Sequence, residues 1–295
     1  MNMETKRAKA ERLRELHRQG SILILPNAWD PLSARAFESC GFPAVATTSA
    51  GIAYSFGYPD GERVGREEIA EATKRIVGAV AVPVTADVEA GYGPSPEDAA
   101  ETARAVVGAG AVGLNLEDVA DASPPGQEGS SVEEAAGPLV ELAVQAEKIR
   151  AVVAVGEESG VPLVVNARTD VYWRSVGDDP GRRYSETVRR ANAFLEAGAD
   201  CVFVPGVKDS ETILGLARQI SGPLNVLAGP GVPTIPELAD LGVKRVSVGS
   251  GPARAVMGLV RRIGRELLDG GTYASLTEGT VPYDEANGLF LEEGS

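Results

Sequence analysis

Residues 81–118 read AVPVTADVEAGYGPSPEDAAETARAVVGAGAVGLNLED. Two short, β-rich apolar runs, Val82–Ala86 and Val112–Leu116, stand at its ends, and a longer helical pattern, Pro96–Gly108, lies between them. The helical pattern begins with proline and ends with glycine, as helix caps do, and a GAG turn leads into the second run. Nearly continuous apolar strands joined by a helix are typical of a parallel sheet covered by helices. The stretch therefore predicts a parallel βαβ unit.

The same alternation continues along the whole chain. Eight apolar runs have this character: Ile22–Leu25, Ala44–Thr48, Val82–Ala86, Val112–Leu116, Leu163–Ala167, Cys201–Val204, Leu224–Leu227 and Arg245–Val248. The helical patterns between them also include Pro31–Cys40, Arg66–Val77, Leu139–Gly156, Ser185–Gly198, Glu211–Ile220 and Thr234–Leu241. Eight such units favour closure into a (β/α)8 TIM barrel. An open, doubly wound sheet is the alternative, but it needs a glycine-rich turn after its first strand, where this chain has PNAWD. We expect a single α/β barrel domain over residues 1–295.

Two segments exceed what a barrel needs. Residues 251–295 contain a further helical pattern, Ala253–Leu268, and then a tail, 269–295, rich in glycine, proline and acidic residues. We expect this extension to pack against another subunit. The long non-periodic insert 118–138 follows the fourth strand. Because such loops open onto the face that carries barrel active sites, we interpret it as an active-site lid.

Composition excludes several classes of protein. The net charge of −14 argues against nucleic acid as a partner, because binding it requires clustered Lys and Arg. The sequence has no apolar stretch near the ~20 residues that cross a bilayer and no apolar signal-peptide core at its N-terminus. Cys40 and Cys201 are the only cysteines, too few for a disulfide framework, and we expect both to be buried structural thiols. These features favour a cytoplasmic protein without a membrane partner.

His17 is the only histidine, and it precedes the first strand. A Ser-His-Asp triad, a histidine base or a zinc site with histidine ligands would have to use it. We expect His17 to be a solvated helix residue instead. Catalysis must then rest on carboxylates, Arg, Tyr, Ser, backbone amides or a metal held by oxygen atoms.

Acidic residues gather where the predicted strands end. Asp87 and Glu89 are two apart on an extended segment, so their carboxylates point to the same side; Glu117 ends the next strand, and Asp60 follows the second strand in YPDG. Grouped carboxylates repel one another unless a cation neutralises them. Oxygen ligands without His or Cys suit Mg²⁺, or Mn²⁺. The alternative is that these acids form turns and cap helices, which applies most to Asp60 and Asp118.

Other candidates lie at the same end of the strands. Arg168 can bind a substrate carboxylate with its planar guanidinium, although a structural salt bridge is the alternative. The turn Ser49-Ala50-Gly51 can direct backbone N–H groups at an oxyanion, and Tyr92 is a candidate proton donor. Seven aromatic residues also follow the strands, where they would line an apolar part of the substrate or pack between subunits: Trp29, Tyr54, Phe56, Tyr58, Tyr92, Tyr172 and Trp173.

Several of these motifs occur together in one known family. TTSAGIA, the Asp60 turn, TADVEAGYG, NLED and NARTD, in this order, resemble the isocitrate lyase/phosphoenolpyruvate mutase superfamily. PNAWDPLSARAFESCGFPAV at residues 26–45 and LGVKRVSVGSGPAR at residues 241–254 are similar too. The resemblance extends from about Leu23 to Leu268.

The resemblance implies a barrel whose final helix is exchanged between the subunits of a dimer or tetramer. It implies Mg²⁺ held directly by Asp87 and mostly through water by Asp60, Glu89 and Glu117. A small 2-oxo acid or related carboxylate would chelate the metal. Its oxygens would lie against the substrate-binding residues, which are Ser49, Ala50, Gly51, Asp87, Asn166 and Arg168, with Arg168, Ser49 and Tyr92 as the catalytic candidates.

The chain also departs from the family. Lyase members carry a Lys-(Lys/Arg)-Cys-Gly-His loop after the fourth strand, whereas residues 119–137 here read VADASPPGQEGSSVEEAAG. That segment lacks the lyase cysteine, and its acidic residues would repel a phosphonate dianion. We therefore favour carbon–carbon cleavage by a lyase, decarboxylase or acyl hydrolase through an enolate. The alternatives are phosphoenolpyruvate/phosphonopyruvate mutase or hydrolase chemistry and a non-catalytic barrel scaffold.

Overall fold

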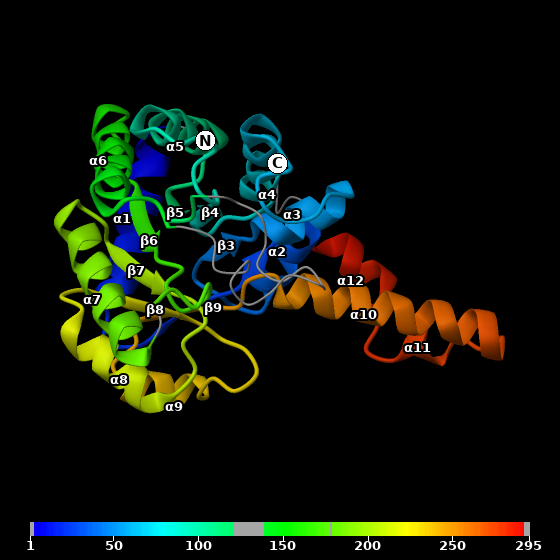
Figure 1. The fold of residues 1–295 in the computed structure, drawn as a ribbon. Helices are drawn as coiled ribbons and strands as arrows, with labels where there is room; N and C mark the ends of the chain where they lie inside the picture. The colour runs from blue at the N-terminus through cyan, green and yellow to red at the C-terminus, as the bar shows by residue number, and fades with distance from the viewer. Residues whose placement is uncertain (1–2, 121–138, 178, 292–295) are drawn as a thin grey trace.

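The computed structural model describes residues 3–120, 139–177 and 179–291, and in these ranges parallel strands form one barrel (Figure 1). The strands are β1 (Leu23–Leu25), β2 (Asn27–Ala28), β3 (Val45–Thr47), β4 (Val84–Asp87), β5 (Gly113–Glu117), β6 (Val164–Arg168), β7 (Cys201–Val204), β8 (Leu224–Leu227) and β9 (Arg245–Ser247). Their order in the sheet is β1-β9-β8-β7-β6-β5-β4-β3-β2. All eight predicted runs are strands, and the prediction of a (β/α)8 barrel is confirmed.

The ninth strand arises because the first predicted run is split. Pro26 lies between β1 and β2, and a proline has no N–H to give to a ladder. β1 pairs with β9, whereas β2 pairs with β3. Residues 23–28 thus pair with both ends of the sheet and close it. The alternative of an open, doubly wound sheet is wrong.

Helices surround the strands, and most follow the predicted patterns. They are α1 (Met3–Arg18), α2 (Pro31–Ser39), α3 (Ser49–Phe56), α4 (Arg66–Ala79), α5 (Pro96–Ala109), α6 (Leu142–Glu158), α7 (Pro180–Glu196), α8 (Ser210–Gln219), α9 (Ile235–Asp240) and α10 (Gly251–Arg265). A π-helical turn, η1 (Glu266–Gly270), and the short helices α11 (Ala274–Thr277) and α12 (Tyr283–Gly288) follow. None of the helices in the described ranges is long and apolar enough to cross a membrane.

The prediction that His17 is solvated is wrong. His17 lies on the same face of α1 as Ala10 and Leu13, and all three side chains are buried. Its Nδ1 lies 2.8 Å from the Leu13 carbonyl, an acceptor, so Nδ1 carries the proton and Nε2 is free to accept. Burial, with the nearby Arg245 as the next cause, lowers the pKa of His17 to about 4. His17 is therefore a neutral residue of the barrel interior.

The two cysteines differ. Cys201 in β7 is buried, as predicted. Cys40 is exposed, so the prediction that it is buried is wrong. Its position explains this, because Cys40 is the C-cap of α2 and lies where that helix ends at the surface.

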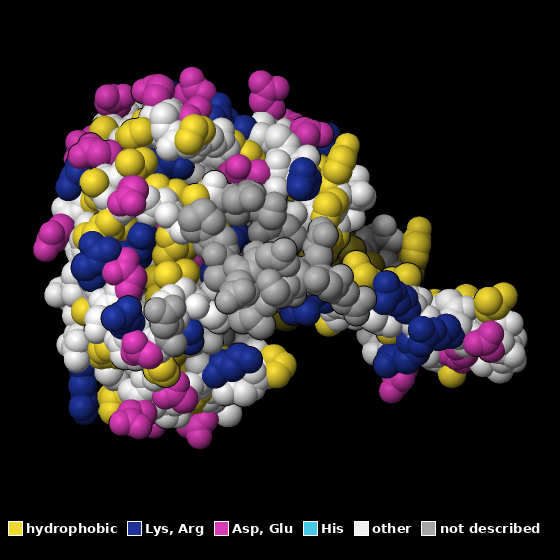
Figure 2. All heavy atoms as spheres, in the orientation of Figure 1, with side chains coloured by type: hydrophobic (Ala, Val, Ile, Leu, Met, Phe, Trp, Pro, Cys, Tyr) yellow, Lys and Arg dark blue, Asp and Glu magenta, His cyan; other side chains and the backbone are white. Residues whose placement is uncertain are grey.

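The C-terminal extension leaves the barrel as a projecting arm (Figure 1). None of the residues of α10 is buried in the described chain, and Figure 2 shows Lys and Arg side chains gathered along the arm beside hydrophobic ones. The tail returns to the barrel at α2, where Arg35 Nε donates to the Leu289 carbonyl (2.6 Å). Most of the predicted lid, residues 121–138, lies outside the described residues.

Candidate active site

The carboxyl ends of the strands surround a cavity of about 110 Å³. Its lining consists of Asn27, Thr48, Ser49, Ala50, Asp60, Asp87, Asn115, Arg168, Trp173, Phe203, Pro205, Leu227, Ser247, Gly249 and Ser250. Because one water occupies about 30 Å³ of liquid, this space suits a ligand of only a few heavy atoms. The structure thus brings together Ser49, Ala50, Asp60, Asp87 and Arg168, as the sequence predicted.

Two carboxylates face each other across one serine. Asp87 ends β4, and its Oδ2 accepts hydrogen bonds from Ser49 N (3.0 Å) and Ser49 Oγ (3.1 Å). The same hydroxyl lies 3.5 Å from Asp60 Oδ1. Thr47 Oγ1 accepts a hydrogen bond from Asp87 N (2.8 Å) and so fixes the strand end. The pair of acids lies at the N-terminus of α3, where free amides favour negative charge.

Ser49, Ala50 and Gly51 form the first turn of α3 rather than an isolated turn. Thr48 is the N-cap, and its Oγ1 accepts a hydrogen bond from Gly51 N (3.4 Å). The Ser49 amide is bonded to Asp87, whereas Ala50 lines the cavity. The predicted oxyanion donors therefore belong to a helix N-terminus, and two of the three are already bonded within the chain.

The loop after β4 holds Glu89 and Tyr92 in a left-handed backbone conformation, with φ of 50° and 57°. This conformation costs a non-glycine residue about 1–2 kcal/mol. Glu62, with φ of 52°, contacts both residues. Its N–H donates to Glu89 Oε2 (2.6 Å), and its Oε1 accepts from Tyr92 N (2.8 Å). Sequence reasoning missed Glu62, although it stands two residues after Asp60.

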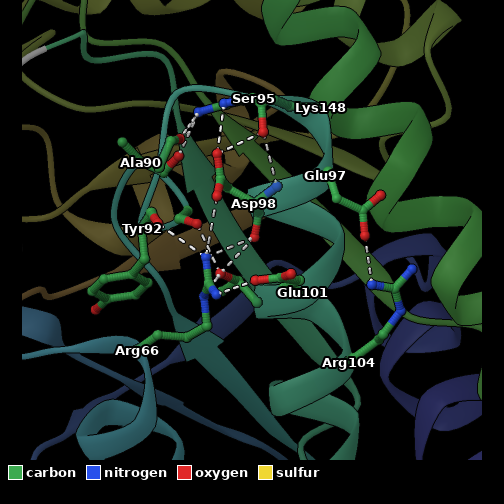
Figure 3. Close-up of polar contacts among 12 residues, drawn as sticks. Arg66, Ala90, Tyr92, Ser95, Glu97, Asp98, Glu101, Arg104 and Lys148 are labelled. Atoms are coloured by element: carbon green, nitrogen blue, oxygen red, sulfur yellow. Dashed lines mark hydrogen bonds and ion pairs between the residues drawn. The ribbon is translucent and has the colours of Figure 1, made fainter.

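Side chains from α4, α5 and α6 hold the outer side of this loop (Figure 3). Every carbonyl from Ala90 to Gly93 accepts one of their hydrogen bonds: Ala90 and Gly93 from Lys148 Nζ (2.9 and 2.7 Å), Gly91 from Thr102 Oγ1 (2.8 Å) and Tyr92 from Arg66 Nη2 (3.0 Å). Lys148 is only 1 % exposed. We call Arg66, Thr102 and Lys148 the loop clamp. Sequence reasoning missed all three, because helix residues of these types usually face water.

Arg168 ends β6 and is fully engaged by acids. Its Nε and Nη2 donate to the two oxygens of Asp170 (2.5 and 2.8 Å), and its Nη1 lies 2.6 Å from Glu117 Oε2. The guanidinium also stacks over Phe203, 5.8 Å from the ring centre. The two hydrogen bonds and the ion pair fix its orientation at the cavity wall. The salt-bridge alternative is therefore present in the structure, together with the predicted position at the mouth.

Asp118 supports the neighbouring turn and is not part of the cavity lining. Its Oδ2 accepts from Thr169 Oγ1 (2.7 Å) and pairs with Arg190 Nη1 (3.1 Å), and its Oδ1 accepts from Asp170 N (2.9 Å). Both Asp118 and Arg190 are buried. These contacts favour the structural interpretation of Asp118.

Three acids at this end of the barrel have raised pKa values. Burial, followed by Asp60 and Asp87, raises the pKa of Glu89 to about 8. Burial and Asp87 raise the pKa of Asp60 above its ordinary value, and burial raises that of Glu117 well above it. Burial is the largest cause of all three shifts, and Arg168 opposes it at Asp60 and Glu117.

Two further predicted residues lie away from the cavity lining. Asn166 is fully buried and donates through Nδ2 to Asn115 Oδ1 (2.6 Å). The Tyr92 hydroxyl is buried without a hydrogen-bond partner among the described residues. Its burial and the neighbouring Glu89 raise the pKa of Tyr92. The roles of Asn166 in substrate binding and of Tyr92 as proton donor stay predictions.

The donor set fits a metal that takes few protein ligands. In residues 3–120, 139–177 and 179–291, no three acidic, His or Cys side chains converge as a ready metal cage. Asp60 and Asp87 are the pair closest to a shared point, whereas Glu89 and Glu117 are turned to Glu62 and Arg168. Mg²⁺ commonly uses one or two carboxylates and keeps several waters. The residues present therefore fit Mg²⁺ at Asp60 and Asp87, and the roles of Glu89 and Glu117 as ligands through water stay predictions.

The sequence profile of the phosphoenolpyruvate phosphomutase family matches residues 13–268. The chain belongs to this family. A solved structure of a related lyase/mutase has the barrel described above. The predicted resemblance to the isocitrate lyase/phosphoenolpyruvate mutase superfamily is confirmed.

The relatives of this phosphomutase-family chain include an uncharacterized protein and enzymes of several activities. An uncharacterized protein of Mycobacterium tuberculosis H37Rv is 36 % identical over 281 residues, which are 94 % of this chain and 95 % of the relative. The structure of a candidate lyase/mutase from Burkholderia cenocepacia J2315 is 34 % identical, covers 98 % of both chains and superposes with a TM-score of 0.86. A phosphonopyruvate hydrolase complex with oxalate and Mg²⁺ is 25 % identical, covers 95 % of this chain and 94 % of that chain, and has a TM-score of 0.78. More distant relatives include 2-methylisocitrate lyase and oxaloacetate decarboxylase.

Proposed function

We propose that this chain is a Mg²⁺-dependent enzyme that cleaves a carbon–carbon bond of a small 2-oxo acid or related carboxylate through an enolate. The observation that carries the proposal is the cavity of about 110 Å³ in which Asp60 and Asp87 face each other across Ser49 beside the fixed Arg168. The phosphonopyruvate hydrolase relative binds oxalate with Mg²⁺, and oxalate resembles the enolate of pyruvate. Oxaloacetate-like compounds are therefore the first substrates to test.

Each wall of the cavity has a distinct task in this proposal. Asp87 and Asp60 would hold Mg²⁺, which when bound stabilises negative charge on a ligand. Arg168, which Asp170 and Glu117 hold in place, is a preorganised cation, so no reorganisation free energy is needed to orient it during the reaction. The first turn of α3 adds the positive end of a helix at Ala50. The remaining wall, at Trp173, Phe203, Pro205 and Leu227, keeps water from a reactive carbanion.

Calorimetry with oxalate, with and without Mg²⁺ or Mn²⁺, tests the proposal. We expect binding that depends on the metal and is lost in Asp87→Ala. Asp240→Ala, which removes an exposed acid at the end of α9, is the control and should bind like the wild type. Binding of oxalate that is equal without metal, or unchanged in Asp87→Ala, would contradict the proposed site. Absence of binding under all conditions would favour the scaffold alternative.

A substrate assay separates the two enzymatic alternatives. We expect release of pyruvate or of a similar product from oxaloacetate-like acids, with no phosphate from phosphonopyruvate. The acidic segment 119–137 motivates this order, because it has no Lys or Arg to offset the charge of a phosphonate. Phosphate release from phosphonopyruvate would instead establish the hydrolase chemistry of the 25 % identical relative.

We also propose that the α10 arm is exchanged between two copies of the chain. The arm exposes Val256, Met257, Leu259 and Val260, an apolar surface that a second copy could cover. A surface hollow near Trp29 and Tyr58 is lined by aromatic side chains and by Glu67, Glu68 and Glu71, which would complement the arginines of the arm. Light scattering should give a dimer or tetramer for the full chain and a smaller species for a chain ending at residue 250. Equal masses for both would contradict the exchange.

A further inference from the structure

A buried arginine without an acidic partner lies inside the barrel. Arg245 points inward from β9 and is fully buried. Its Nη1 lies 3.4 Å from His17 Nε2, its Nη2 donates to Asn115 Oδ1 (3.3 Å), and its Nε has no partner among the described residues. Burial lowers the pKa of Arg245 to about 10, so it keeps its charge at neutral pH. An unpaired buried cation lowers the stability of the fold, so its presence favours a functional role for Arg245.

Both contacts of Arg245 are to neutral acceptors. The Leu13 carbonyl fixes the proton of His17 on Nδ1, so Nε2 can only accept. His17 therefore closes one side of the guanidinium without neutralising it. The other contact directs the charge toward Asn115, which lines the cavity.

These bonds fix the orientation of the Asn115 amide. Asn115 Oδ1 accepts from Asn166 Nδ2 (2.6 Å) as well as from Arg245 Nη2 (3.3 Å). Both donors come from the barrel interior, so the amide oxygen must face inward and the Nδ2 group must lie on the other side. In the described part of the chain, Asn115 Nδ2 donates to no residue. Asn115 is also the register partner of Asp87 on the adjacent strand, which places it beside the proposed metal site.

We propose that Asn115 donates a hydrogen bond from Nδ2 to an oxygen of the carboxylate ligand, and that Arg245 is a positioning residue that holds Asn115 in this orientation. This inference rests on the proposed function. A ligand oxygen in this cavity can bind only to a cation or to a neutral donor, because Asp60 and Asp87 repel it. Asn115, which lines the cavity, supplies such a neutral donor.

Substitution of Asn115 by aspartate tests the donor directly. Asn115→Asp keeps the shape and can still accept from Arg245 and Asn166, so we expect a melting temperature equal to or above that of the wild type. It replaces the donor with an acceptor on the cavity side, so Mg²⁺-dependent oxalate affinity should fall by about 10- to 100-fold. Asn287→Asp, an exposed asparagine of α12, is the matched control and should leave the affinity unchanged.

Substitution of Arg245 by methionine tests the positioning. Removing a buried unpaired charge should leave the melting temperature unchanged or raise it, while the freed Asn115 amide should weaken oxalate binding by about tenfold. A purely structural arginine would give the opposite pattern, with a lower melting temperature and normal affinity in the folded protein. That pattern would overturn the positioning role.

An NMR titration of the wild type keeps the test independent of any variant. The side-chain NH₂ pair of Asn115, assigned through its backbone, should shift when oxalate and Mg²⁺ are added together. If oxalate binds but this pair does not move and Asn115→Asp retains full affinity, the present inference fails and the proposed function stands. If wild-type protein binds no oxalate with Mg²⁺, the proposed function fails and this inference falls with it.

Discussion

Lys148→Met should destabilise the chain and loosen the loop that carries Glu89. Lys148 Nζ donates to the carbonyls of Ala90 (2.9 Å) and Gly93 (2.7 Å). A hydrogen bond from a charged donor contributes about 1.5–3 kcal/mol, so two bonds contribute about 3–6 kcal/mol. Burial also lowers the pKa of Lys148, which shows that the ammonium is partly desolvated. Methionine removes that cost, and we expect a net loss of about 2–3 kcal/mol in the free energy of unfolding.

Urea denaturation measures the loss, and amide hydrogen exchange locates it. Arg104→Met is the matched control, because Arg104 lies close by (Figure 3) but pairs with Glu97 (2.8 Å) at the exposed surface. Such an exposed pair contributes little to stability. Exchange should accelerate at the amides of residues 89–93 in Lys148→Met only, since the strained φ angles of Glu89 and Tyr92 relax once the clamp is weakened. A loss no larger than that of Arg104→Met, with unchanged exchange in the loop, would refute the reasoning.

Three other perturbations probe the barrel around this loop. The pKa of His17 is lowered from 6.5 to about 4, so between these values the unfolded chain binds one more proton than the folded chain. The free energy of unfolding is therefore highest above pH 6.5 and falls by about 3 kcal/mol toward pH 4. The single imidazole NMR signal should titrate near 4, not near 6.5. Arg190→Met leaves Asp118 buried without its cation and should cost about 3–5 kcal/mol in denaturant titrations, whereas a change below 1 kcal/mol would show that the pair is dispensable. Gly206→Ala, at φ of 88° and with an added Cβ only 2.9 Å from Trp173 N, should lower the melting temperature and alter Trp173 fluorescence at the cavity, and an unchanged emission spectrum would contradict that contact.

The strands of this barrel were predictable because buried parallel strands are continuous apolar runs. The helices were predictable mainly where caps are visible, and two boundaries show the limit. α7 begins at Pro180, after an Asp179 N-cap, five residues before the predicted Ser185, because its first turn, PGRR, has no large apolar residue to mark a helical period. α3 was interpreted as a turn, since its first residues are small and buried, and neither property distinguishes a helix from a loop.

Only the site residues at the ends of the strands were predictable from the barrel fold. The ends of neighbouring strands must meet, which is why Asp87 and Arg168 were found. Lys148 and Arg245 could not be found in this way. Their partners are tens of residues away in the sequence, and the contacts depend on which side of a helix or strand faces inward. His17 is intermediate: its spacing from Ala10 and Leu13 places it on the apolar face of α1, and this periodicity could have predicted its burial.

The distribution of unfavourable features argues against an inert scaffold. All the described non-glycine residues with positive φ, Glu62, Glu89, Tyr92 and Ser175, lie in connections that lead from a strand to the next α4, α5 or α7 helix. Each costs about 1–3 kcal/mol and persists only where surrounding contacts impose it. Acids with raised pKa values also lie at the carboxyl ends of the strands. A barrel that served only to hold its shape could relieve this strain and charge by substitution without loss, so their concentration at one end of the barrel favours a site that binds and reacts.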